Sequence, residues 1–460
     1  MSGTAAGAGE RTGAGRGLTW ITHALLLAVF GALVFYVTRV VPEVNGRLWT
    51  IAAVGFLLLA GTLMSELLAP LGLPHLTGYL IAGIASGPHV LRLVDEHTVK
   101  SLSPVNMLAL ALIALAGGAE LELSTVQRNM RSLAWATTMQ SVFVLVVAGG
   151  TFVAARPIIP FARALSPGAV AAVAMCWGAL AVTRSPSATL GILSQTRATG
   201  PLANFTLAFV MVSDVLVVIL VATVLAIAKP LADPGATFRV DAFVTLAHNL
   251  LGSIAIGSAL GLVIAAYLRL VNRQMLVVLL VLGFGLTTVL DYLQFDSLLA
   301  FMVAGFVVRN LSRQGHRFIE YIEKTGTVVY VVFFAIAGAD LDIPLLRALW
   351  PVALLLAGAR AGTTWVAARL ANSIAKDPPT LVAWSWSGLI SQAGLALGLS
   401  VIVAREFPAF GTPFRALAIA TVAINEMIGP VLFKLALDRS GETSRAPAAS
   451  FPSMAPPPLE

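Results

Sequence analysis

The sequence predicts an all-α membrane protein that crosses the bilayer many times. Of its 460 residues, 58% are hydrophobic and only 11% are charged, and the mean hydropathy is +0.89. A soluble protein usually carries about 25% charged residues. Long uncharged runs recur from Leu18 almost to Arg439, and they do not alternate in polarity as the strands of a β-barrel would.

The net charge of +7 and the single cysteine narrow the range of possible functions. The basic residues lie mostly in short loops between the apolar runs, so they bear on topology and not on nucleic-acid binding. Cys176 alone excludes an intrachain disulfide and a Cys-rich metal site. Because no Gly-rich nucleotide loop or His/Cys cluster appears, we expect no cofactor, and neither an ATP-driven pump nor an enzyme.

The apolar runs predict about fourteen membrane spans. Residues 1–17 are expected to form a disordered tail, residues 18–41 an extra N-terminal transmembrane helix, and residues 438–460 a disordered C-terminal tail. The other expected spans are 48–70, 74–90, 103–119, 131–155, 168–193, 201–228, 243–269, 273–291, 295–309, 323–339, 345–370, 379–404 and 411–437. With the N-terminus inside, the inward loops hold more Lys and Arg, so we expect both termini in the cytoplasm.

An internal repeat divides the chain. Gly118-Ala-Glu-Leu-Glu-Leu recurs as Gly338-Ala-Asp-Leu-Asp-Ile, and Gly78-Tyr-Leu-Ile-Ala-Gly recurs loosely from Ala300 at nearly the same separation. The sequence therefore predicts two six-helix repeats, 48–228 and 273–437, with 243–269 as a linker helix between them. Equivalent helices are an odd number of spans apart, so the repeats are inverted in the membrane, as in many secondary transporters.

The fifth helix of the first repeat is predicted to be discontinuous. Thr183, Arg184 and Ser185 precede Pro186 in the middle of this span. Proline removes an amide donor, and the residue before it avoids helical geometry. The alternative is an ordinary kinked helix repaired by hydroxyl hydrogen bonds.

The equivalent helix of the second repeat carries the same kind of signal. Gly388 and Gly394 flank Ser391 and Gln392 in an otherwise apolar span. Carbonyls freed at two such breaks, with the hydroxyls and amide beside them, could coordinate a cation.

A lone carboxylate lies in the sixth helix of the first repeat. Asp214 follows Ser213 in a long apolar run, and its nearest charged neighbours in sequence are Arg197 and Lys229. At ~1.5 Å per residue this places Asp214 near the middle of the bilayer, where a charge costs about 3 kcal/mol. We expect an ion or proton site, and the alternative is a protonated acid that serves helix packing.

Three further charges are expected inside the membrane. Glu426 aligns roughly with Asp214 in the second repeat, Arg360 lies in a long apolar run, and Arg184 sits at the first break. Two acids and two arginines would leave the interior near neutral, so Arg360 and Glu426 are expected either to form an ion pair or to contact the ion. The acids of the repeated Gly-Ala motif are expected to act as caps and loop contacts.

The chain resembles the cation:proton antiporter superfamily. The residues that carry this resemblance are Leu71-Gly-Leu-Pro74, Gly78-Tyr-Leu, Ala82-Gly83, Gly87-Pro88, residues 118–123, Thr183-x-Ser185-Pro186, the Asp214 helix and Ser391-Gln392-x-Gly394. Within the superfamily, the sequence is most similar to the monovalent cation/proton antiporter-2 branch, which holds bacterial sodium/proton exchangers and Kef-type potassium/proton systems. The resemblance covers about residues 48–437 and implies thirteen core helices, two crossed broken helices, a homodimer and an elevator-like movement.

The resemblance also implies roles for individual residues. Asp214 matches the ion-binding aspartate of the family, and Arg360 lies in the helix where relatives keep a Lys or Arg that steadies the crossing. Ser213 occupies a position that is Asp in many electrogenic relatives, so one-for-one electroneutral exchange is expected. Arg184 departs from the family pattern, and a fixed positive charge near Asp214 would weaken cation binding.

The resulting prediction is a Na⁺ or K⁺/proton antiporter in the bacterial inner membrane, in contact with lipids and no nucleic acid. Thr183, Ser185, Ser213, Gln392 and freed carbonyls near 183–186 and 388–392 are expected to complete an oxygen shell around a monovalent cation at Asp214. Two alternatives stay open. One is a Kef-type efflux system with channel-like flux, which would need a separate regulatory subunit for gating. The other is an anion transporter on the same fold, with Arg184 and Arg360 facing the substrate.

Overall fold

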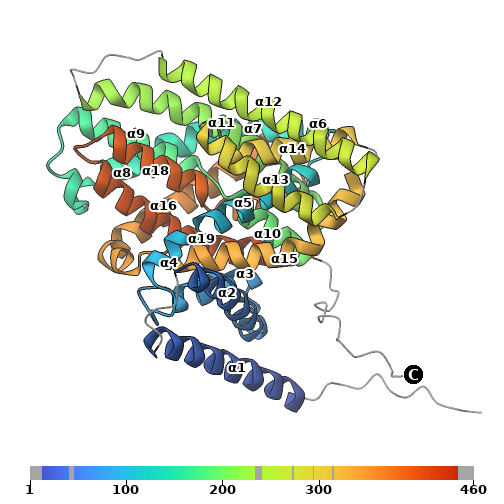
Figure 1. Cartoon of the computed structure of the whole chain (residues 1–460). Coiled ribbons are helices and arrows are strands. Elements are labelled where there is room, and N and C mark those ends of the chain that lie inside the picture. The colour runs from blue at the N-terminus through green and yellow to red at the C-terminus, as the bar shows by residue number, and fades with distance from the viewer. Residues whose placement is uncertain are drawn as a thin grey trace, which may run out of the picture.

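The computed structural model describes residues 13–40, 46–233, 241–271, 274–293, 295–312 and 315–443, and every regular element in these ranges is helical (Figure 1). Each predicted apolar segment coincides with one helix or with consecutive helices. The α-helices are α1 (Gly13–Val40), α2 (Gly46–Leu68), α3 (His75–Ser86), α4 (Glu96–Ser101), α5 (Ser103–Glu120), α6 (Leu123–Arg128), α7 (Met130–Thr138), α8 (Val144–Ala155), α9 (Pro167–Val182), α10 (Pro186–Thr196), α11 (Pro201–Ala232), α12 (Asp241–Leu270), α13 (Met275–Tyr292), α14 (Ser297–Leu311), α15 (Gly315–Ala339), α16 (Ile343–Ala375), α17 (Pro379–Trp384), α18 (Gly394–Glu406) and α19 (Gly411–Ser440). Short 3₁₀ or π segments are η1 (Ala69–Leu71), η2 (Met139–Phe143), η3 (Arg156–Ile158), η4 (Pro160–Ala162) and η5 (Ser385–Leu389).

The helices are long and apolar enough for a protein that spans a membrane. In the described ranges, eight helices meet this criterion, and the bent pair Pro379–Leu389 and Gly394–Glu406 brings the number to nine. Shorter apolar stretches lie at Ile21–Tyr36, Val277–Leu290, Ser297–Leu311 and Val328–Ala339. The total of about fourteen spans stays a prediction.

The chain ends differ from the sequence-based boundaries where the structure describes them. α1 begins at Gly13, inside the expected tail of residues 1–17, and α19 continues through Ser440, past the expected boundary at 437. The rest of the expected tails, residues 1–12 and 444–460, lies outside the described residues.

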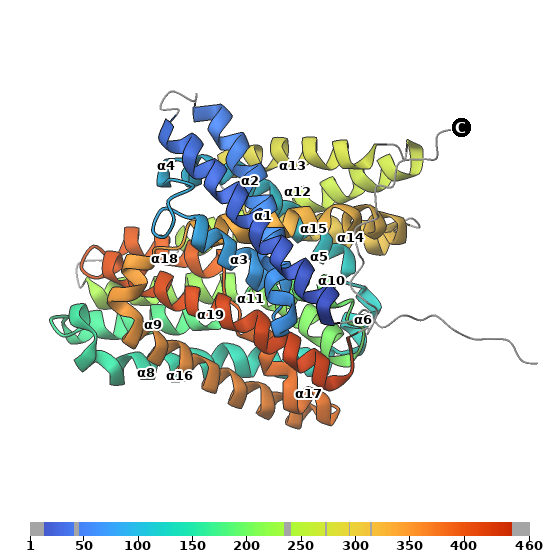
Figure 2. The ribbon, with the colours of Figure 1, turned by 90° about the horizontal axis from the view of Figure 1, so that it is seen from below.

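Two groups of helices pack side by side (Figure 2). We name α7–α11 and α16–α19 the site bundle, because these helices surround the polar residues considered below. We name α2, α3, α5 and α12–α15 the flanking bundle. α1 packs against α2 at the edge of the flanking bundle, away from the site bundle (Figure 1).

Glycines allow two pairs of helices in the flanking bundle to approach closely. A Cβ at Gly83 of α3 would overlap the Ala335 carbonyl of α15, and a Cβ at Gly338 of α15 would overlap the Leu80 carbonyl of α3. The pair α5 and α14 repeats this arrangement, because Gly118 faces the Met302 carbonyl and Gly305 faces the Leu115 carbonyl. Only glycine fits at such a backbone approach.

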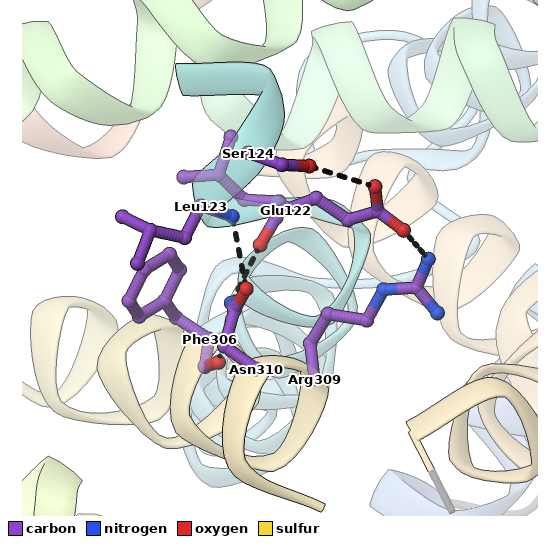
Figure 3. A network of polar contacts seen from close by, with 7 residues as sticks. Glu122, Leu123, Ser124, Phe306, Arg309 and Asn310 are labelled. Atoms are coloured by element: carbon purple, nitrogen blue, oxygen red, sulfur yellow. Dashed lines mark hydrogen bonds and ion pairs between the residues drawn. The ribbon is translucent and has the colours of Figure 1, made fainter. Parts of the chain in front are cut away.

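Two acids of the repeated motif, Glu122 and Asp342, make the loop contact and the cap that the sequence predicted. Figure 3 shows Glu122, just after α5, in an ion pair with Arg309 near the end of α14. Asn310 accepts a hydrogen bond from the Leu123 amide at 2.9 Å and donates to the Leu121 carbonyl at 3.0 Å. In the second repeat, Asp342 caps α16 by accepting from the Leu345 amide at 2.9 Å. These contacts fix helix ends in the flanking bundle and at the start of α16.

Candidate functional site

The first broken helix has the geometry that the sequence predicted. α9 ends at Val182, residues Thr183 and Ser185 are extended, and α10 restarts with Pro186 at its first turn. The Ser185 hydroxyl caps α10 by accepting from the Ala188 amide at 3.2 Å. Proline is favourable at this position because the first amides of a helix have no partner within the helix.

The second break lies between the two glycines that predicted it. η5 ends at Leu389 and α18 begins at Gly394, with the two halves bent by 48°. Gly388 itself lies inside η5, where an added Cβ would be 3.0 Å from the Phe433 ring, so its role there is close packing. The break proper is at residues 390–393.

The two breaks contact each other through Gln392. Its amide nitrogen donates to the Leu180 carbonyl at 2.7 Å and to the Thr183 hydroxyl at 2.9 Å, both at the first break. Its amide oxygen accepts from Asn425 of α19 at 2.7 Å. Gln392 therefore ties both broken helices to the helix that carries Glu426.

Arg360 of α16 binds the carbonyls that the two breaks leave free. Its guanidinium donates to Ala181 and Thr183 at the end of α9, both at 2.8 Å. It also donates to Ile390 at 2.7 Å and Leu389 at 3.2 Å, at the end of η5. The last carbonyls of a helix carry partial negative charge, so one buried guanidinium satisfies two helix ends at once.

This geometry corrects two expectations. Within the described residues, Arg360 and Glu426 form no ion pair, because the guanidinium is already bound by backbone oxygens. The same bonds occupy carbonyls near 183 and 388–392 that were expected to contribute to an oxygen shell around the ion. The physical reason is that four carbonyls at two helix ends, which carry partial negative charge, bind the Arg360 guanidinium directly.

Asp214 lies on α11, which packs against α9, α10 and η5. Its side chain is only 4% exposed, and in the part of the chain that the structure describes both carboxylate oxygens are without a hydrogen-bond partner. The hydroxyl of Ser213, also buried, donates to the Val210 carbonyl of its own helix at 3.0 Å. A buried carboxylate without partners is costly, so any positive partner that reaches it gains a large stabilisation.

Arg184, at the first break, is almost completely buried. One terminal nitrogen donates to the Val182 carbonyl and the other to the Gln140 side-chain oxygen at 2.8 Å. The guanidinium carbon stands 4.9 Å from the centre of the Phe209 ring of α11. Among the described groups, its Nε finds no hydrogen-bond acceptor.

Glu426 is buried in α19, next to Asn425. One of its carboxylate oxygens, Oε1, has no hydrogen-bond partner among the described residues, whereas at Asp214 both oxygens have none. The structure thus brings Thr183, Gln392 and Arg360 into one hydrogen-bonded network. Asp214, Ser213 and Glu426 lie on helices that pack beside this network, and their side chains are not bonded to its described members.

Two polar residues at this site were not predicted from sequence. Gln140 lies in η2, a π-helical turn between α7 and α8, and is fully buried. Glu442, just after α19, caps the helix that carries Asp214: its carboxylate accepts from the Leu202 and Ala203 amides of α11, both at 2.8 Å. The sequence offered one sign of Gln140, a single amide inside an apolar run. Glu442 lies in the segment that was predicted to be a disordered tail.

A cavity of ≈ 720 Å³ lies between the two bundles. Helices α10 and α11 form one wall, and α5, α13 and α15 form the other; the polar lining includes Glu120, Arg197, Asn204 and Tyr330. Leu207 of α11 also lines the cavity and precedes Asp214 by two helical turns, about 10 Å along the axis. Asp214 itself does not line the cavity.

Residues 54–437 match the family described as sodium/hydrogen exchanger, transmembrane. The match covers most of the chain, and the chain belongs to this family of integral membrane proteins, whose activity class is cation/proton exchange and not enzyme catalysis. A search of curated protein sequences finds no match.

Solved structures show the same fold. One structure of the sodium proton antiporter MjNhaP1 from Methanocaldococcus jannaschii matches with a TM-score of 0.64 at 18% identity, covering 86% of this chain and 97% of that chain. An electron-microscopy structure of the same antiporter matches with a TM-score of 0.68 at 18% identity, covering 87% of this chain and 99% of that chain.

Proposed function

We propose that this protein exchanges one monovalent cation for one proton, with Asp214 as the shared binding group. The observation that carries the proposal is a buried carboxylate with both oxygens unpartnered among the described residues, on a helix beside two broken helices. A proton and a dehydrated cation would compete for this carboxylate. Only the neutralised site would cross the apolar barrier, and this couples the two fluxes.

The proposed oxygen shell is smaller than the sequence suggested. Arg360 binds carbonyls of both breaks and Ser185 caps α10, so the candidate ligands left beside Asp214 are the side-chain oxygens of Thr183 and Ser213. The same bonds argue against an anion carrier, since the Arg360 guanidinium is already filled by carbonyls. The identity of the cation, Na⁺ or K⁺, is part of the proposal to be tested.

Ser213 supports electroneutral exchange. It places a hydroxyl beside Asp214 where a second carboxylate would add a second proton, and that hydroxyl is bonded to its own helix. With a single carboxylate, the site carries either one proton or one monovalent cation, so an exchange cycle moves no net charge across the membrane. The exchange rate in proteoliposomes is then expected to be independent of an imposed membrane potential.

The mirrored glycine contacts support an inverted repeat. Gly83 and Gly338 join α3 to α15 as Gly305 and Gly118 join α14 to α5, so each helix pair reproduces the other with the two repeats exchanged. We therefore assign 48–228 and 273–437 as the repeats, with α12 as the linker. The two repeats would then be related by an approximate two-fold axis in the membrane plane.

We also propose an elevator-like movement of the site bundle against the flanking bundle of a homodimer. The cavity between the bundles supports this, because it separates parts of α10 and α11 from α5, α13 and α15. Spin labels on α3 and α10 should change their separation when cation is added, and a fixed separation contradicts the movement. Light scattering of the purified protein tests the homodimer.

We also propose that the protein lies in a bacterial inner membrane with both termini in the cytoplasm. Labelling of single introduced cysteines from either side of the membrane tests this topology.

The deciding experiment replaces the carboxylate. In everted vesicles with a pH-sensitive dye, Asp214→Asn should abolish the fluorescence recovery that NaCl or KCl produces with the wild type. Asp233→Asn, the same change at the end of the same helix, should keep the response. Exchange at the wild-type rate by Asp214→Asn would refute the proposed site.

A further inference from the structure

Gln140 combines deep burial with an unusual backbone. It lies in the π-helical turn η2, which interrupts the span formed by α7 and α8, and its side chain is 0% exposed. Single π turns inside α-helices are found frequently at functional sites. Burial of an amide is tolerated only when both of its polar ends are bonded.

Both ends of the Gln140 amide are bonded to parts of the site. Its nitrogen donates to the Thr364 carbonyl of α16 at 3.0 Å, one turn from Arg360 on the same helix. Its oxygen accepts from Arg184 at 2.8 Å, and the other terminal nitrogen of Arg184 is bonded to Val182. The terminal nitrogens of this guanidinium are therefore both engaged away from α11.

Arg184 nevertheless packs against the helix that carries Asp214. Its guanidinium rests on the Phe209 ring, about one and a half turns along α11 from Asp214. In the part of the chain that the structure describes, the Arg184 Nε and both Asp214 oxygens are unpartnered. A buried, positively charged side chain with an unsatisfied donor thus packs against the helix that carries a buried, unsatisfied carboxylate.

We infer that Gln140 is a positioning residue: it holds the Arg184 guanidinium back from Asp214 and so keeps the carboxylate open to the transported cation. This inference rests on the proposed role of Asp214. Without Gln140, Arg184 would gain most by turning its free donors to the carboxylate, because opposite charges attract strongly in a buried site. Arg184, a positive charge attached to the protein, would then compete with the transported cation for the Asp214 carboxylate.

The test measures the cation concentration for half-maximal exchange, KM, and the maximal rate, Vmax, with NaCl and in parallel with KCl. Gln140→Leu should raise KM about tenfold, equivalent to about 1.4 kcal/mol, with Vmax largely retained. Gln140→Glu should lower KM, because its carboxylate pairs with Arg184 and offsets the positive charge at Asp214. Neither shift should appear when Arg184→Gln is present in the same chain.

The double substitution separates positioning from general damage. If Gln140→Leu acted by disturbing packing, its effect on KM would persist in the Arg184→Gln chain, and the inference would be overturned. A KM for Gln140→Leu within about twofold of wild type would overturn it equally. Ser132→Ala, which removes a buried hydroxyl elsewhere in the same span, should leave KM unchanged. Failure of the underlying function is recognised separately, since Asp214→Asn would then retain exchange.

Discussion

The two broken helices differ in what stabilises them. At the first break, Ser185 caps the second half and a charged residue, Arg184, is buried in the extended segment. At the second break, α18 begins without a side-chain cap, and the buried polar residues, Ser391 and Gln392, are neutral. The first break therefore carries a charge that the second lacks, although the proposed inverted repeat would make them equivalent.

The two buried arginines near these breaks differ in the same way. Arg360 donates to four backbone carbonyls, two at each break, and so belongs to the framework. Arg184 has one carbonyl and one amide oxygen, and among the described residues its Nε has no acceptor. The comparison indicates that a guanidinium with an acceptor at each nitrogen holds the fold, whereas one with an unpartnered nitrogen is free to respond to the charge of the site.

The largest expected effect is on stability, from Arg360→Ala. Removing the guanidinium leaves four buried carbonyls at two helix ends without their donor, so we expect a loss of about 3–5 kcal/mol. The measurement is thermal unfolding in detergent, followed by fluorescence-detected size exclusion. Arg360→Lys should recover part of the loss, because an ammonium has three donors but lacks the planar fork.

The matched control is on the same helix. Arg369 of α16 is exposed and stands over the Trp365 ring at 5.7 Å, so Arg369→Ala should cost only about 0.5–1 kcal/mol. If Arg360→Ala were no more damaging than Arg369→Ala, the framework role of Arg360 would be wrong.

The second effect is on transport. Arg184→Gln removes the positive charge near Asp214 and keeps an amide that can bond to Gln140, so we expect KM for the cation to fall about threefold or more with little change in stability. The NaCl and KCl titrations described above measure it. Loss of exchange in a folded Arg184→Gln protein would instead place Arg184 in direct contact with the substrate, as an anion carrier requires.

The sequence predicted the positions of the breaks because their cause is local. Pro186 and the cluster of hydroxyls and glycines act on the backbone within one turn, and isolation in an apolar run was enough to single out Asp214. The partner of Arg360 was not predictable in the same way. Counting charges suggested Glu426, but the guanidinium meets carbonyls of two segments that only the folded chain brings together.

Gln140 and Glu442 show a second limit. Each acts across a long sequence separation, Gln140 on Arg184 and Glu442 on the first turn of α11. One amide in an apolar span or one acid after a helix has many equally good local explanations. The fold class follows from composition and periodicity, whereas these contacts depend on helix packing that no local pattern specifies.

The smallest expected effect concerns the cap that only the first break has. Ser185 was predicted as an ion ligand, but its hydroxyl accepts from the Ala188 amide at 3.2 Å and contacts the Ser187 hydroxyl at 3.0 Å. Because this hydroxyl caps α10, Ser185→Ala should lower the unfolding free energy by about 1 kcal/mol and leave KM for the cation unchanged. Ser166→Ala, which removes the equivalent cap at the start of α9, should cost a similar amount. A rise in KM for Ser185→Ala alone would show instead that this hydroxyl reaches the cation, and the first break would then contribute a ligand as well as a charge.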